Sequence, residues 1–158
     1  ILGVPLIDKW GRRPLLILGL IGMSFGWALL AWTFSHHEQT GALHWLTTTG
    51  MWLYIACFAF SLGPVMWLLI SEVFPLSVRG LGSSVATSVN WASNMLVTFT
   101  FLSLVQYFGT GGTFWLYFVL SILSLIFIYF FVPETKNVSL EQIEANLYAG
   151  KSSRHMGA

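Results

Sequence analysis

The sequence predicts an all-α integral membrane protein, and three observations lead to this fold class. Hydrophobic residues make up 56% of the 158 residues, whereas charged residues make up only 8%. An ordinary soluble surface cannot be built from so few charged side chains. Residues 14–34, 39–71 and 80–133 carry no charged side chain, and each run is long enough to cross a bilayer at about 20 residues per helix. The basic residues lie only outside these runs.

Four membrane-spanning helices are expected, preceded by the end of a fifth. Residues 1–7 are apolar but too short to cross a bilayer, so we expect them to be the tail of a helix whose beginning is missing. The charged segment 8–13 separates them from the first full span, which begins at Pro14. Within this span Gly22 and Gly26 form a pair of small residues at the spacing used for close helix packing.

The second span occupies the apolar part of residues 39–71. We expect it to be broken at Gly63 and Pro64, because a proline removes one main-chain hydrogen bond from a helix. The run 80–133 is too long for a single crossing. Its polar, glycine-rich segment 108–113 therefore divides it into the third and fourth spans.

The basic residues determine the predicted orientation. Four spans place the first charged segment, the loop after the second span and the polar tail on one side of the membrane, and these segments hold all seven Lys and Arg residues. Because basic loops are retained in the cytoplasm, we expect both ends of the chain to be cytoplasmic. The predicted division is a transmembrane half-bundle over residues 1–132 and a cytoplasmic tail over residues 133–158.

The break in the second span is the first candidate binding feature. Pro64 leaves the Phe60 carbonyl without its usual partner, and lipid cannot supply one. Trp67 follows Gly63 by four residues and shares its helix face, so an indole N–H lies beside bare backbone. This arrangement favours a ligand platform. The alternative is that the proline only kinks the helix and that Trp67 only packs.

Polar side chains recur along one face of the third span. An amide inside a bilayer needs a partner, either across a helix interface or in an aqueous cavity. Asn90, Asn94 and Trp91 together suit a sugar, because carboxamides donate and accept hydrogen bonds and an indole offers a plane to the ring. The alternative is that the two amides only join helices. The polar stripe consists of Thr87, Asn90, Trp91, Asn94 and Thr98.

Catalytic chemistry and nucleic-acid binding are not expected. No serine is accompanied by a base and an orienting acid, and no histidine lies in a predicted span. His36, His37 and His44 lie in a polar loop, where ordinary solvation is favoured over metal binding. The basic residues form no patch of the kind that nucleic acid requires. We therefore expect a lipid-embedded protein that is not an enzyme and that uses no cofactor or metal.

Four motifs in order resemble the sugar porter family of the major facilitator superfamily. Residues 8–13 (DKWGRR) resemble the loop between the eighth and ninth helices of that family, and residues 63–67 (GPVMW) with residues 71–80 resemble the tenth helix and its exit. Residues 90–94 (NWASN) resemble the eleventh helix, and residues 133–136 (PETK) the motif after the twelfth. The likeness is greater to bacterial galactose or arabinose proton symporters, through residues 93–95, 112–117 and 133–141.

The resemblance implies a secondary active transporter of a bacterial inner membrane, which carries a monosaccharide of the galactose, arabinose, xylose or glucose type with protons by alternating access. The residues that it implies for substrate binding are Trp67, Asn90, Trp91, Asn94 and Gly63. It also implies a cytoplasmic ion-pair network that holds the two halves together in the outward-facing state. The members of this network are Asp8, Arg12, Arg13, Glu72 and Arg79.

The resemblance covers only the end of the eighth helix through the twelfth. In the family, the proton-coupling acid lies in the first helix and most sugar-binding glutamines lie in the fifth and seventh, so the expected partners include the missing N-terminal helices. Residues 59–61 also lack the glutamate that some facilitative members carry before the Gly-Pro break. The alternative function is a stand-alone membrane interaction fragment without transport activity.

Overall fold

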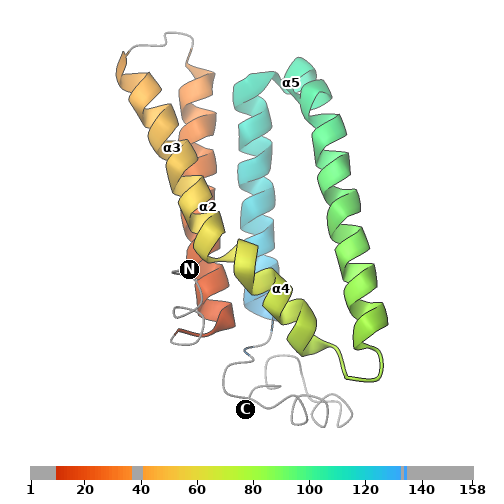
Figure 1. Cartoon of the computed structure of the whole chain (residues 1–158). Helices are drawn as coiled ribbons and strands as arrows, with labels where there is room; N and C mark the ends of the chain where they lie inside the picture. Colours follow the sequence, from red (N-terminus) through yellow and green to blue (C-terminus); the bar gives the residue numbers. More distant parts are fainter. Residues whose placement is uncertain (1–9, 37–40, 133, 135–158) are drawn as a thin grey trace.

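The computed structural model describes residues 10–36, 41–132 and 134, and within them the only regular elements are helices. The prediction of an all-α protein is thus confirmed for this part of the chain. Three helical stretches in it are long and apolar enough to cross a membrane, namely Arg12–Ser35, Gly41–Val73 and Arg79–Phe131. The helices are α2 (Arg12–Ser35), α3 (Gly41–Phe60), α4 (Leu62–Val73) and α5 (Arg79–Phe131) (Figure 1).

Helix α5 reverses its direction at Gly109. This residue has φ 72° and ψ 169°, which are not helical angles and which a glycine adopts without steric cost. In Figure 1 the part before Gly109 and the part after it run in opposite directions. The glycine-rich segment that was predicted to divide the last apolar run therefore contains a turn. We refer to residues 79–108 and 110–131 as the first and second parts of α5.

Helix α2 is the central helix of the bundle, since it packs against both α3 and α5. Leu15, Leu16 and Leu20 are at most 3% exposed. They form an apolar core with Val65 of α4 and Ile128 of the second part of α5. Because these leucines are buried against α4 and α5, α2 is the helix on which the other helices pack.

Small residues bring α2 and α3 into close contact. A Cβ atom on Gly22 would overlap with the Cys57 sulfur, and one on Gly26 would crowd the main chain of α3. The predicted pair of small residues is thus used for helix packing. Gly19 has the same role opposite Ser61, although the sequence did not single it out.

The break between α3 and α4 lies at Ser61, whose φ of −117° and ψ of −98° are not helical. The break was predicted at Gly63 and Pro64, which was wrong, because both residues lie within α4 and the break comes two residues before Gly63. The first turn of a helix has no intrahelical partners for its N–H groups, so Pro64 fits there as the third residue of α4. The Ser61 hydroxyl donates a 2.9 Å hydrogen bond to the Leu15 carbonyl, which fixes the break against α2.

Replacing Gly19 with alanine should destabilise the bundle, because the added Cβ would overlap with the Ser61 side chain. We expect a loss of about 1–3 kcal/mol, the usual cost of overpacking, measured as a lower melting temperature of the detergent-solubilised protein. Gly80→Ala is the matched control, since nothing lies within 4 Å of its Cβ position. Equal melting temperatures for the two variants would contradict the close contact.

Candidate functional site

The polar stripe lies on the first part of α5, where Asn90 and Asn94 interact with each other. The Asn94 amide nitrogen donates to the Asn90 main-chain carbonyl (2.9 Å) and to the Asn90 side-chain oxygen (3.2 Å). The Thr98 hydroxyl donates to the Asn94 carbonyl at 2.8 Å. The Asn94 side-chain oxygen accepts no hydrogen bond from any described residue, so the pair keeps an open acceptor.

The stripe is uncovered by the described part of the chain. Asn94 is exposed, Asn90 is half-buried, and residues 91–100 are all exposed. Exposed amides on a membrane-spanning helix are costly against hydrocarbon. This face therefore needs either further protein or an aqueous cavity in front of it.

The two candidate tryptophans are also exposed. Trp67 on α4 is 47% exposed and Trp91 on α5 is 67% exposed. Within the described residues, neither indole makes a hydrogen bond or a ring contact, and Trp67 lies on α4 whereas Trp91 lies beside Asn90 on α5. Gly63 lies against α3, where a Cβ atom would be 3.2 Å from the Phe58 carbonyl oxygen. Its contact is thus one of helix packing at the break.

At one end of the bundle, an ion pair joins α2 to α4. Arg12 Nη2 lies 2.9 Å from Glu72 Oε1, and the two side chains are only 14% and 17% exposed. Limited exposure reduces screening by solvent but also costs desolvation of both charges, so the net strength of the pair stays modest. The beginning of α2, the end of α4 and the end of α5 all lie at this end, opposite the Gly109 turn (Figure 1).

The other predicted members of the network have different contacts. Arg13 Nη2 donates to the Tyr129 carbonyl at 2.7 Å, and its guanidinium carbon lies 5.4 Å from the centre of the Tyr129 ring. Arg79 Nε donates to the Phe74 carbonyl at 3.3 Å. Asp8 lies outside the described residues. Both arginines are thus held on main-chain carbonyls.

Glu134 is a member of this charged end that the sequence did not identify as such. Its two carboxylate oxygens accept hydrogen bonds from the main-chain N–H groups of Arg12 (3.0 Å) and Arg13 (3.1 Å). Glu134 therefore caps the start of α2 and joins it to the residues after α5. The available signal was its place in the PETK motif, on the same predicted side of the membrane as Arg12.

Gly11 makes this cap possible. Its φ of 93° is in the region that favours glycine, and a Cβ atom would lie 2.7 Å from Glu134 Oε2. The motifs at residues 8–13 and 133–136 therefore meet through one glycine and one carboxylate, although 122 positions separate Arg12 from Glu134.

The family profile described as "Sugar (and other) transporter" matches residues 1–147. The chain belongs to the sugar porter family. The profile covers both the charged end and the polar stripe of this sugar porter. Since the proteins matched are named as transporters and symporters, it is a member of a transporter family and not of an enzyme family.

Two relatives in Escherichia coli strain K12 are similar over almost the whole sugar porter chain. The galactose-proton symporter is 38% identical over 157 residues, which are 99% of this chain and 34% of the relative. The arabinose-proton symporter is 40% identical over 154 residues, or 96% of this chain and 33% of the relative. The chain thus spans about a third of the length of these curated relatives.

The fold is likewise similar to a solved transporter of the major facilitator superfamily. The inward-open xylose transporter XylE from E. coli superimposes with a TM-score of 0.81 at 37% identity, over 91% of this chain and 31% of that one. The sugar porter chain is accordingly a multi-pass membrane protein, as its long apolar helices predict.

Replacing Glu134 with glutamine should weaken the start of α2. Glutamine keeps the size but removes the charge and one of the two acceptor oxygens, so we expect a loss of about 1–2 kcal/mol. Hydrogen exchange should become faster at the amides of Arg12 and Arg13. Amides in the middle of α3 are the internal control, and exchange that rises equally there would contradict a local cap.

Proposed function

We propose that the chain is the C-terminal part of a secondary active transporter that carries a monosaccharide together with protons. The observation that carries the proposal is the exposed polar stripe on a helix that is otherwise suited to lipid. A face of this kind fits an aqueous path for a polar solute between helices. The names of the galactose- and arabinose-proton symporters support a monosaccharide as the substrate and protons as the coupled ion.

In this proposal, the described residues make four membrane crossings. They are α2, α3 with α4, and the two parts of α5, which correspond to the ninth through twelfth helices of the major facilitator fold. Residues 1–7, which were predicted to end an eighth helix, lie outside the described residues. Both ends of the chain face the cytoplasm, with a bundle over residues 1–132 and a tail over residues 133–158, and the membrane is a bacterial inner membrane.

The proposed sugar site uses α4 and the first part of α5 as one wall. Asn90 and Asn94 supply hydrogen-bonding groups, and Trp67 and Trp91 supply aromatic planes and N–H donors. Gly63 lets α4 begin close to α3 beside the site. Because Trp67 lies on α4 and the asparagines lie on α5, the sugar itself is proposed to bridge the two helices.

The charged end is proposed to be part of a cytoplasmic latch. Arg12 and Glu72 lie in the same chain, so their pair cannot by itself join two halves of a transporter. The ion pair holds the charges of Arg12 and Glu72 in place for partners from the N-terminal half. Arg13, Arg79 and Asp8 are proposed as further members of the same latch. Contacts of this type must break in every transport cycle, which suits pairs of modest strength.

Alternating access requires two halves that move about a central site. The N-terminal helices, with the acid that couples transport to protons, are therefore proposed as partners of this chain. A membrane interaction fragment without transport is the second candidate, since the uncovered stripe would also suit association with another polypeptide. Sugar-dependent protection of the stripe separates the two functions.

Alanine at Trp67 or Asn90 in the complete transporter should lower sugar affinity about tenfold, the cost of one or two lost hydrogen bonds. The measurement is competition for uptake by a series of monosaccharides in proteoliposomes. Trp115→Ala and Thr100→Ala are the matched controls, because Trp115 contacts Phe118 and the Thr100 hydroxyl bonds only to its own helix. Wild-type affinity in both site variants would contradict the assignment.

Replacing Arg12 or Glu72 with glutamine should shift the complete transporter away from the state that is closed on the cytoplasmic side. A double-mutant cycle should give a coupling of about 1 kcal/mol, since each single change already removes the pair. Distances between spin labels on the cytoplasmic ends report the populations. The double-mutant cycle of Arg12 with His36, which lies at the opposite end of α2, is the control and should give a coupling near zero.

A further inference from the structure

We infer that the outer face between α2 and the second part of α5 is a binding groove for one anionic phospholipid. The geometry provides a site for the phosphate at one end and a channel for an acyl chain along the helices. This inference concerns the face of α2 that is turned away from α3 and uses none of the proposed sugar-binding residues, although it shares Arg13 with the proposed latch.

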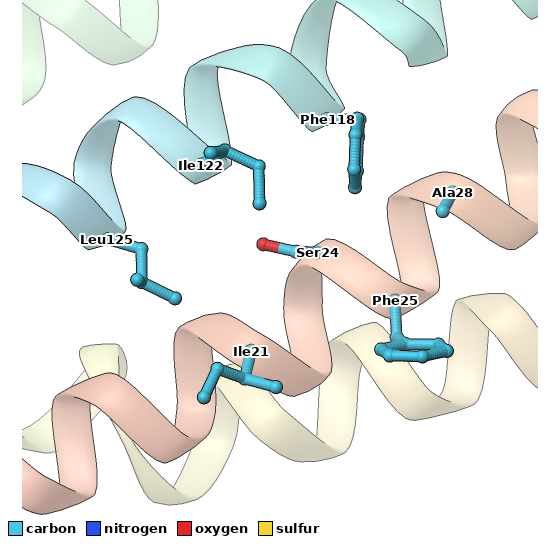
Figure 2. A pocket seen from close by; sticks show the side chains of 7 residues that line it. All are labelled: Ile21, Ser24, Phe25, Ala28, Phe118, Ile122 and Leu125. Atoms are coloured by element: carbon cyan, nitrogen blue, oxygen red, sulfur yellow. The ribbon is translucent and has the colours of Figure 1, made fainter.

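The apolar part of the groove is a hollow of about 310 Å³. Ile122, Leu125 and Phe118 of α5 are directed toward α2 in Figure 2, with Ser24 of α2 between the two helices. Ser24 is the only residue with a polar side chain among those lining the hollow, and its hydroxyl bonds to Leu20 and Ser121 (2.7 and 2.8 Å). The lining therefore offers no unsatisfied polar group and suits a hydrocarbon chain.

The end of the groove that carries a positive charge begins where this hollow ends. A second hollow, of about 600 Å³, shares Ile21 with the first and extends to Trp10, Arg13 and Tyr129. At about 1.5 Å per residue, the distance from Arg13 to Ala28 along α2 is about 22 Å. This exceeds half of a hydrocarbon core of about 30 Å, so one acyl chain can follow the groove within a single leaflet.

The charge of the second hollow determines which lipid fits. Arg13 makes no ion pair with any described residue, and its hydrogen bond from Nη2 goes to the uncharged Tyr129 carbonyl. No Asp or Glu lines either hollow, and Glu134 nearby uses its oxygens on the main-chain N–H groups of Arg12 and Arg13. A phosphate is the group that a guanidinium in this state binds best.

Two aromatic residues indicate that this end lies at the membrane interface. Trp10 is 51% exposed, and Tyr129 supports the guanidinium through its ring and its carbonyl. Amphipathic rings of this kind gather at the level of lipid head groups. The phosphate would thus lie beside Arg13 and Trp10, with the acyl chain along Ile21 toward Ala28.

The test is native mass spectrometry of the complete protein, released from nanodiscs that contain phosphatidylglycerol and phosphatidylcholine. The wild type should retain phosphatidylglycerol preferentially. Arg13→Gln should lower this preference about fivefold, the factor expected for one basic residue near an anionic lipid. Arg79→Gln removes the same charge away from the groove and should leave the preference unchanged; equal losses in both variants would overturn the site.

A second pair of variants tests the acyl channel. Ala28→Phe fills the apolar hollow and should reduce retained lipid severalfold, whereas Ala56→Phe makes the same change on an exposed position of α3. Equal retention in these two variants would overturn the channel. Melting temperatures without lipid separate a folding defect from a lost site, and a variant that melts below the wild type is replaced by Ala28→Leu.

Three further outcomes would overturn the inference. If inorganic phosphate displaces bound phosphatidylglycerol as effectively as added phosphatidylglycerol does, the site is one for a free anion. A dimer mass without retained lipid would mean that a second copy covers this face. Absence of retained lipid from the monomer would mean that other helices of the same protein fill the groove.

Discussion

Lipid cannot satisfy main-chain or side-chain polar groups, and this constraint governs the whole structure. It explains why only helices are found among the described residues and why their breaks occur at particular positions. The break at Ser61 is fixed by a hydrogen bond to α2, and the turn at Gly109 uses a residue without a Cβ atom. It also means that the uncovered asparagines of α5 need hydrogen-bonding partners, which lipid tails cannot provide.

Helix α2 links the remaining elements. Glycines along one face allow α3 to approach closely, and leucines on another form the core with α4 and α5. At its beginning, the side chain of Arg12 pairs with Glu72 while its main-chain N–H is capped by Glu134. A movement of α4 or of the end of α5 would therefore strain the start of α2. This mechanical coupling is what supports the proposed latch.

The two exposed faces of the bundle differ in chemistry. The stripe of Asn90 and Asn94 is polar within an apolar helix, so it requires protein or water. The groove between α2 and the second part of α5 is apolar along its length and basic at one end, so it matches an anionic lipid.

The sequence alone determined the membrane environment, the all-α class and the family, because charge-free runs and local motifs depend only on nearby residues. It also predicted a division within residues 108–113, where the turn lies at Gly109, and the packing use of Gly22 and Gly26, since turn and packing chemistry are local. Only the tertiary structure decided which distant residues meet. The cap of Arg12 by Glu134, the contact of Gly19 with Ser61 and the exact break before Pro64 depend on how α2 packs against other helices, and no spacing within one segment encodes that packing.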